Sequence, residues 1–320
     1  MLNNKSFAIV LALSIAQIGI GISSFAEDYP NDLKLQEAIQ AYDAKQFDRA
    51  RSILISIEKE GNANEITYYY LGLIAHDKEE FQTAEKYYRK AIATNSQYAP
   101  PYSDLSVLLL NSGDLAEAEE MAITSTEIDP AFVKGFMNLA AIQYNQKRYQ
   151  DAYNSFVAAA RIDPDAVSSQ GDLMILGYND PKAALYYYGI VLRVMPDHPL
   201  ALLNSGVCNK VLGRIEEAEM YFQKAYEITS IDREPFNVAY SSYFRLLLDT
   251  AQYEKIVEHA LDRVDSNYMS AQYFLSLAYF KMPNKKKEFE EAASNYFSIS
   301  GEKKPRSLQE WAEEQIKPPK

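Results

Sequence analysis

The side chains best suited to catalysis or metal binding are few in this sequence and lie far apart. The three histidines, His76, His198 and His259, are separated by roughly 60 to 120 residues, so no pair has the i, i+4 spacing of a helical zinc site. The chain contains no HExxH, G-x-S-x-G, Walker A or G-x-G-x-x-G motif. Its one cysteine, Cys208, has no CxxC partner and lies near the small residue Gly206, which favours a buried structural thiol over a nucleophile.

Adjacent carboxylates occur at Glu79-Glu80, Glu119-Glu120 and Glu216-Glu217. Each pair falls in a turn or early in an expected helix, where negative charge interacts favourably with the N-terminal end of the helix dipole. Two carboxylates act as an acid–base pair only when a pocket holds a substrate between them, and nothing near these pairs indicates a pocket. We therefore predict no catalytic residue, no metal site and no cofactor, and a chain that is not an enzyme.

The composition narrows the class of protein further. Of the 320 residues, 48% are hydrophobic, which is enough to bury a core and excludes wholesale disorder. Asp and Glu (44) outnumber Lys and Arg (32), and the formal net charge of −12 argues against nucleic-acid binding, which needs clustered basic side chains. The basic run Lys285-Lys286-Lys287 is interpreted as a solvated loop, the alternative being contact with an acidic partner or anionic lipid.

The amino terminus has the pattern of a secretory signal peptide. Residues 7–22 carry no charge, and Ser24 and Ala26 supply the small residues that a signal peptidase accepts before the acidic Glu27. The apolar stretch is short for a membrane span, which needs about 20 residues. We expect residues 1–26 to be removed by cleavage between Ala26 and Glu27, giving a periplasmic or secreted protein. The alternative is an uncleaved anchor, in which case alone the membrane is a partner.

A repeat with a period of 34 residues runs along the chain. An aromatic residue or leucine followed three residues later by alanine recurs at this interval, in Phe47–Ala50, Phe81–Ala84, Leu115–Ala118 and Tyr149–Ala152. A small residue recurs at a second position, in Ala38, Gly72, Ser106 and Ala140. Each period holds two segments with apolar residues at i, i+3, i+4 and i+7, the spacing of one helix face. The small residues allow two antiparallel helices to pack closely.

This pattern of large and small positions resembles the tetratricopeptide repeat, a helix–turn–helix unit of about 34 residues. The resemblance implies an all-α fold, a right-handed α-solenoid of about eight helix pairs followed by a C-terminal capping helix. We place the array at residues 27–300 and the capping helix and tail at residues 301–320. The expected units lie near residues 31–64, 65–98, 99–132, 133–166, 167–198, 199–236, 237–268 and 270–300. Gly113 and Gly213 fall between helices, where a positive φ is expected.

In tetratricopeptide arrays the first helix of each unit lines a concave groove. By resemblance, the residues that would face a partner are Tyr69, Leu73, His76, Val107, Leu110, Asn111, Met137, Asn138, Tyr144, Asn145, Ile175, Tyr178, Leu203, Val207 and Lys210. Such an apolar, aromatic groove suits an extended peptide or an amphipathic helix. The alternative for each residue is packing against the neighbouring unit.

One subclass of these arrays binds the C-terminal carboxylate of a chaperone through a clamp of Lys, Asn and Arg. At the corresponding positions this chain has Tyr69, Leu73, Asp104, Lys134 and Asn138, and only Lys134 matches. The sequence therefore does not support a chaperone carboxylate as ligand.

The predicted function is a non-enzymatic protein–protein interaction scaffold in the cell envelope. It would bind a peptide or helix of a partner in the concave groove, for envelope, pilus, secretion or polysaccharide-export assembly. The alternative is a glycan-binding or enzyme-accessory protein whose groove tyrosines stack on sugar rings. A hydrolase is a third and weaker alternative, because no active site is visible.

Overall fold

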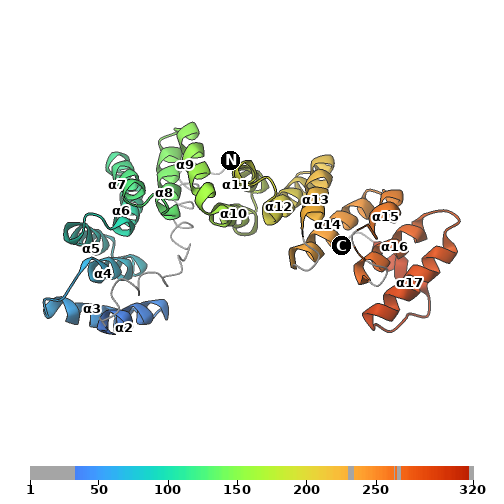
Figure 1. Ribbon diagram of the computed structural model, residues 1–320, viewed down its shortest axis with the longest axis horizontal. Coiled ribbons are helices and arrows are strands. Elements are labelled where there is room, and N and C mark those ends of the chain that lie inside the picture. Colours follow the sequence, from blue (N-terminus) through green and yellow to red (C-terminus); the bar gives the residue numbers. More distant parts are fainter. Residues whose placement is uncertain (1–32, 230–233, 263, 265–267, 317–320) are drawn as a thin grey trace. The chain divides into compact units, whose positions relative to one another are not determined.

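The computed structural model describes residues 33–229, 234–262, 264 and 268–316, and every regular element in these segments is a helix (Figure 1). The chain divides into two compact units, one ending at Leu173 and the other beginning at Met174. The first unit contains α2 (Leu33–Asp43), α3 (Phe47–Lys59), α4 (Glu65–Asp77), α5 (Phe81–Thr94), α6 (Ala99–Ser112), α7 (Leu115–Ile128), α8 (Val133–Asn145), α9 (Tyr149–Ile162) and α10 (Pro164–Asp172).

Helices of the first unit form antiparallel pairs, α2 with α3, α4 with α5, α6 with α7 and α8 with α9, and each pair contacts the next. The repeated small residues lie at the centre of these pairs. Ala50, Ala84 and Ala152 have no exposed surface. At Gly72 an added Cβ would lie 2.5 Å from the ring of Tyr88, so the ring of the second helix packs directly on the backbone of the first. The predicted reason for the small positions is confirmed.

The turn inside each helix pair has one residue with a left-handed backbone. In the first unit these residues include Lys45 (φ 56°), Glu79 (φ 60°), Gly113 (φ 91°) and Lys147 (φ 64°). Only glycine adopts this conformation without steric cost. The positive φ predicted at Gly113 and Gly213 is therefore confirmed, and other pairs adopt the same turn with a strained non-glycine residue.

The second unit is built in the same way, with more fully buried aromatic side chains in its core. It contains the end of the π-helix η2 (Leu173–Gly177) and α11 (Pro181–Val194), α12 (Pro199–Val211), α13 (Ile215–Ile228), α14 (Glu234–Asp249), α15 (Tyr253–His259), α16 (Met269–Lys281), α17 (Lys286–Ser300) and α18 (Leu308–Ile316). Gly206 packs against Phe222 as Gly72 packs against Tyr88, with a would-be Cβ at 2.5 Å from the ring. Tyr240 and Phe244 stack with ring centroids 4.4 Å apart.

The last helix, α18, packs against α14, α16 and α17 of the second unit. Its Ala312 is fully buried, and Trp311 stacks on Tyr296 with ring centroids 5.6 Å apart. The apolar residues of α18 thus pack on one side while its glutamates face outward. The predicted all-α solenoid of helix pairs is confirmed, and one further helix, α18, follows the last pair.

Two of the approximate predicted unit boundaries fall a few residues inside helices. The boundary at 166/167 lies within α10, because Asp163 caps that helix by accepting the N–H of Ala166 at 3.1 Å and Pro164 fits its first turn. The boundary at 236/237 lies within α14, which already begins at Glu234. The predicted cleavage site, Ala26 and Glu27, lies outside the described residues. Among the residues that are described, none of the helices is both long and apolar enough to cross a bilayer.

Candidate functional site

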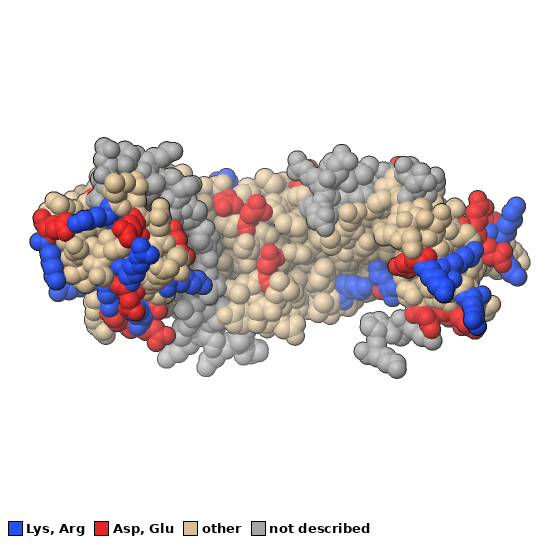
Figure 2. Space-filling view, turned by 90° about the horizontal axis from the view of Figure 1, so that it is seen from below, with Lys and Arg blue, Asp and Glu red and all other residues tan. Residues whose placement is uncertain are grey.

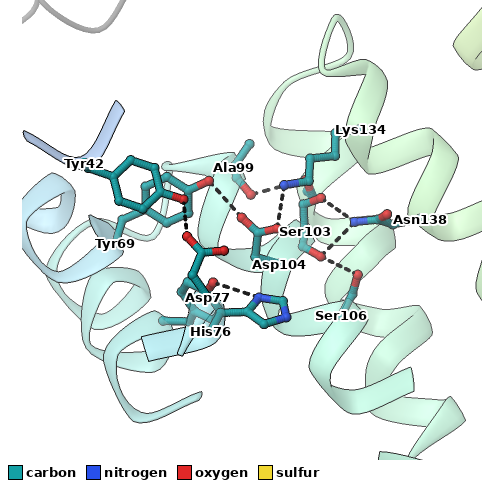
Figure 3. Close-up of polar contacts among 12 residues, drawn as sticks. Tyr42, Tyr69, His76, Asp77, Ala99, Ser103, Asp104, Ser106, Lys134 and Asn138 are labelled. Carbon is teal, nitrogen blue, oxygen red and sulfur yellow. Dashed lines mark hydrogen bonds and ion pairs between the residues drawn. The ribbon is translucent and has the colours of Figure 1, made fainter. Parts of the chain in front are cut away.

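Polar side chains connect the first helices of successive pairs in the first unit (Figure 3). The Tyr69 hydroxyl on α4 donates to Oδ2 of Asp104 on α6 at 2.8 Å. The other carboxylate oxygen, Oδ1, forms an ion pair with Nζ of Lys134 on α8 at 2.7 Å. The Asp104 and Lys134 side chains are only 4% and 11% exposed, so three consecutive first helices share a buried charge pair.

Two further contacts in this unit have the same geometry. Nδ2 of Asn138 donates to the Ser103 hydroxyl oxygen at 2.8 Å, and the Tyr42 hydroxyl donates to Oδ2 of Asp77 at 2.8 Å. In each case the two residues are 35 positions apart, as are Tyr69 and Asp104. Since the repeat is 34 residues long, each residue meets the one a single position further along in the next unit.

Burial shifts the pKa values of two side chains in and beside this cluster, Tyr69 and His76. Burial raises the pKa of Tyr69 well above its usual value, and the charge of Asp104 adds to this effect. Burial lowers the pKa of His76, whose Nδ1 lies 3.4 Å from the Tyr88 hydroxyl. Tyr69 is therefore kept protonated and His76 neutral. The hydroxyl and ammonium donors are directed at Asp104, so the network holds helices together and presents no activated nucleophile.

The residues predicted to face a partner are spread over several environments. Tyr69 and Asn138 belong to the polar network, and His76 packs against Phe81 with ring centroids 5.8 Å apart. Among the other predicted residues, Val107, Leu110, Met137 and Leu203 are buried, Leu73, Tyr144, Asn145 and Ile175 are half-buried, and Asn111, Tyr178, Val207 and Lys210 are exposed. Their role in binding a partner stays a prediction.

The one residue that matched the chaperone clamp is held by the protein itself. Lys134 is paired with Asp104, and this carboxylate stands where the clamp has an asparagine. A carboxylate ligand arriving there would meet a neutralised lysine and a like charge. This geometry agrees with the sequence, which does not support a carboxylate clamp.

An open cleft crosses the first helices of three pairs in the second unit. Its volume is about 800 Å³, and it is lined by Val207, Lys210, Val211, Phe222, Asn237, Val238, Ser241, Ser242, Arg245, Met269, Ser270, Tyr273, Phe274 and Tyr296. Two apolar side chains of the lining are exposed to solvent: Val207 is 39% exposed and Val238 is 47% exposed. Of the predicted partner-facing residues, Val207 and Lys210 lie here.

The charged groups of this cleft are both basic. Among its lining residues only Lys210 and Arg245 carry a charge, although the chain as a whole has a formal net charge of −12. Both contact one carboxylate outside the lining, Asp249, with Lys210 Nζ at 2.9 Å and Arg245 Nε at 3.0 Å. Two cations thus share one anion at the edge of an apolar cleft.

Most of the residues that line this cleft were not predicted from the sequence. One face of α14 carries lining residues at the spacing i, i+3, i+4 and i+7, namely Val238, Ser241, Ser242 and Arg245. The predicted unit began at residue 237, inside this helix, so these residues were not assigned to the face of a first helix. Lys210 and Arg245 are separated by 35 positions, the same spacing as the bonded pairs of the first unit. Applied to the predicted residue Lys210, that spacing would have identified Arg245.

Charged side chains of opposite sign pair on the surface of the first unit. Figure 2 shows acidic and basic groups next to one another over the N-terminal helices, where Lys34 pairs with Glu60 at 2.7 Å and Arg49 with Glu37 at 2.8 Å. Within the described segments, no group of three or more His, Cys, Asp or Glu side chains is arranged to hold a metal ion. Cys208 is buried, as predicted.

Comparison with known proteins gives matches to repeats of one kind. A family model described as tetratricopeptide repeat matches residues 35–100 and 177–232, and a second model with the same description matches residues 133–160. The matched segments include helix pairs of both units.

Curated relatives match only part of this chain. The Hsp70-Hsp90 organizing protein of Triticum aestivum is 30% identical over 88 residues, which are 28% of this chain and 15% of that protein. The protein O-mannosyl-transferase Tmtc3 of Drosophila melanogaster is 24% identical over 128 residues, 40% of this chain and 14% of that protein. This chain therefore spans about a seventh of the length of each of these relatives.

Solved structures give further helical similarities. PilF of Pseudomonas aeruginosa is 18% identical, with 66% of this chain and 96% of that chain covered at a TM-score of 0.45. The family models and the stacked helix pairs agree on the same segments. The chain contains tetratricopeptide repeats.

Proposed function

We propose that this protein is a non-enzymatic scaffold that binds a protein partner, and that the cleft of the second unit is the main contact surface. The observation that carries the proposal is the exposed apolar wall formed by Val207, Val238 and Met269 on three successive first helices. Neighbouring apolar side chains that remain exposed on a rigid surface are typical of interaction sites. The first unit ties its corresponding helices together with internal hydrogen bonds and an ion pair.

We further propose that the scaffold acts outside the cytoplasm. The support is the sequence of residues 1–26, with its uncharged stretch and the small residues before Glu27. An envelope scaffold of this kind would organise proteins of pilus, secretion, polysaccharide-export or outer-membrane assembly. Amino-terminal sequencing of the protein recovered from cells would give Glu27 as the first residue, and an intact Met1 in a membrane fraction would favour the uncleaved anchor.

A chaperone-organising role is not part of the proposal. The name of the wheat relative assigns that role to that protein, and the match covers 88 residues. In this chain Lys134 is bound to Asp104, so the position offers no free cation to a terminal carboxylate.

The test is recovery of partners from an envelope extract with the full chain as bait. The double variant Val207→Asp/Val238→Asp places two charges in the cleft at exposed positions and should lose the partner. Met220→Asp is the matched control, because Met220 is 56% exposed on α13 and lies outside the cleft lining. If the double variant retains every partner and its circular dichroism spectrum is unchanged, the cleft is not the contact surface.

The glycan alternative rests on the tyrosines at one end of the cleft. Tyr273 and Tyr296 line it, but their rings already contact Trp311, with centroid distances of 6.0 and 5.6 Å. Retention on peptidoglycan or exopolysaccharide that is lost in Tyr273→Leu, with protein partners unchanged, would favour this alternative.

A further inference from the structure

The shape of the cleft in the second unit suits the binding of a helix. On α12 its walls are Val207, Lys210 and Val211, at i, i+3 and i+4, and on α14 the lining continues from Val238 to Arg245. Such rows present one face of each helix, so side chains project into the cleft from parallel ridges. A helix with its own apolar ridge can pack between these rows, whereas an isolated small molecule would leave much of the wall exposed.

The protein already seats one amphipathic helix beside this cleft. In α18, Trp311 packs on Tyr273 and Tyr296, which also form the end wall of the cleft. Nη1 of Arg245 donates to the backbone carbonyl of Gln315 at 3.2 Å, and the Tyr273 hydroxyl donates to Oε1 of the same glutamine at 3.2 Å. The docking surface for α18 is therefore continuous with the cleft walls formed by α12 and α14.

Charge selects among the helices that could bind. The cleft contains two cations and no carboxylate among its lining residues, and Asp249 at its edge carries a single negative charge against them. The remaining positive charge lies in a chain with an excess of acidic residues. A partner side chain that brings a carboxylate to Lys210 and Arg245 would be attracted, and a basic one would be repelled.

We propose that the cleft binds an acidic amphipathic helix of a partner protein, with apolar residues at i, i+3 and i+4 against Val207, Val238 and Met269. A Glu or Asp of that helix would form ion pairs with Lys210 and Arg245. This inference rests on the proposed scaffold function and specifies the chemistry of the partner. The partner helix would lie next to α18 and pack on the second unit in the way that α18 does within the chain.

The experiment uses two synthetic helical peptides with the same leucine face. One carries Glu and the other Lys at the flanking positions, with Gln at the remaining polar sites. Binding to the full chain is measured by fluorescence anisotropy. We expect the Glu peptide to bind about tenfold more tightly than the Lys peptide, with a preference that falls at high salt. Val238→Asp should weaken its binding about tenfold or more, and Met220→Asp should leave it unchanged.

Equal affinity for the two peptides, or no binding of the Glu peptide, overturns the inference. The same holds if Val238→Asp and Met220→Asp have equal effects while both variants remain folded by circular dichroism. Lys210→Gln separates the charge contribution, because it should weaken binding of the Glu peptide and strengthen binding of the Lys peptide, so that the preference for the Glu peptide falls. Partners that are recovered from extract independently of the cleft would leave the scaffold function standing and refute only this assignment.

Discussion

In the first unit, residues 35 positions apart on successive first helices are hydrogen-bonded, as Tyr69 is to Asp104 and Ser103 to Asn138. In the second unit the residues with that spacing include Leu203 and Val238, and Val238 projects into an open cleft. The backbone architecture is the same in both units. The comparison shows that one repeat geometry can use its inter-unit positions either for internal cross-links or for an exposed apolar surface.

The buried charge pair should give the largest difference between the units. Asp104→Ala leaves Lys134 buried without a counter-ion and the Tyr69 hydroxyl without its acceptor, which should destabilise the first unit by about 3–5 kcal/mol. Asp249→Ala removes the matching carboxylate of the second unit, where Lys210 and Arg245 are more exposed, and should cost below about 1 kcal/mol.

Hydrogen exchange of peptides from α4, α6 and α8 measures the first effect. The single tryptophan, Trp311, reports unfolding of the second unit in urea. Comparable losses for the two alanine variants would break the distinction between a cross-linked and an open set of first helices.

The second prediction concerns the close contact between a glycine and an aromatic ring that occurs in both units. Gly72→Ala and Gly206→Ala each place a methyl group 2.5 Å from an aromatic ring, on Tyr88 and Phe222, and should each destabilise by about 2 kcal/mol through overpacking. Gly189→Ala is the matched control on α11. Its added Cβ meets no atom within 4 Å, so it should stabilise the helix by up to about 1 kcal/mol.

Urea midpoints read by circular dichroism and by Trp311 fluorescence would compare the two glycines. A neutral Gly206→Ala beside a damaging Gly72→Ala would show that the aromatic core of the second unit yields more easily than that of the first.

The third prediction uses the turns inside the helix pairs. Gly113→Ala and Gly213→Ala force a side chain into the left-handed region, at φ values of 91° and 74°, and should each cost about 1 kcal/mol. Lys147→Gly and Ala251→Gly, in turns of the first and second unit, should act in the opposite direction by about 0.5 kcal/mol. Thermal midpoints measure both signs, and a stabilising Gly113→Ala would contradict the assigned turn.

The smallest expected effect is a pH dependence confined to the first unit. Burial lowers the pKa of His76 in the folded chain, so its contribution to stability is complete above the ordinary histidine pKa of about 6.5. The contribution is lost as the pH falls from there through the lowered pKa of the folded state. After correction for the intrinsic exchange rate, which itself falls with pH, the protection of the α4 amides should therefore decrease as the pH falls below about 6.5. The decrease should be smaller in His76→Gln. An identical pH profile in that variant would rule out His76 as the cause.

Much of the fold could be predicted from residue types alone. The small residues at Gly72 and Gly206 and the larger ones facing them indicated close helix pairs, because packing at these sites tolerates few alternatives. The left-handed turns at Gly113 and Gly213 were predicted for a different reason, because glycine adopts a positive φ without steric cost. The boundary inside α14 was missed, since the unit before it has a longer closing loop and the period no longer marks where the next helix begins.

The candidate site was less accessible to sequence reasoning. Family resemblance assigned groove positions by their number within each unit, and it gave Tyr69 and Val207 equal standing. Whether such a residue is bonded internally depends on what stands 35 positions later in the stacked neighbour, an aspartate for Tyr69 and a serine for Val207. That relation exists only after two units are placed against one another.

The sequence by itself determined the repeat, the helix pairs and the positions of close contact, because these follow from local periodicity and side-chain volume. Tertiary structure decided which polar residues neutralise one another, as Asp104 does Lys134, and which apolar residues remain in contact with solvent. The physical reason is that electrostatic pairing and exposure depend on distances between helices that the chain brings together only when the units stack.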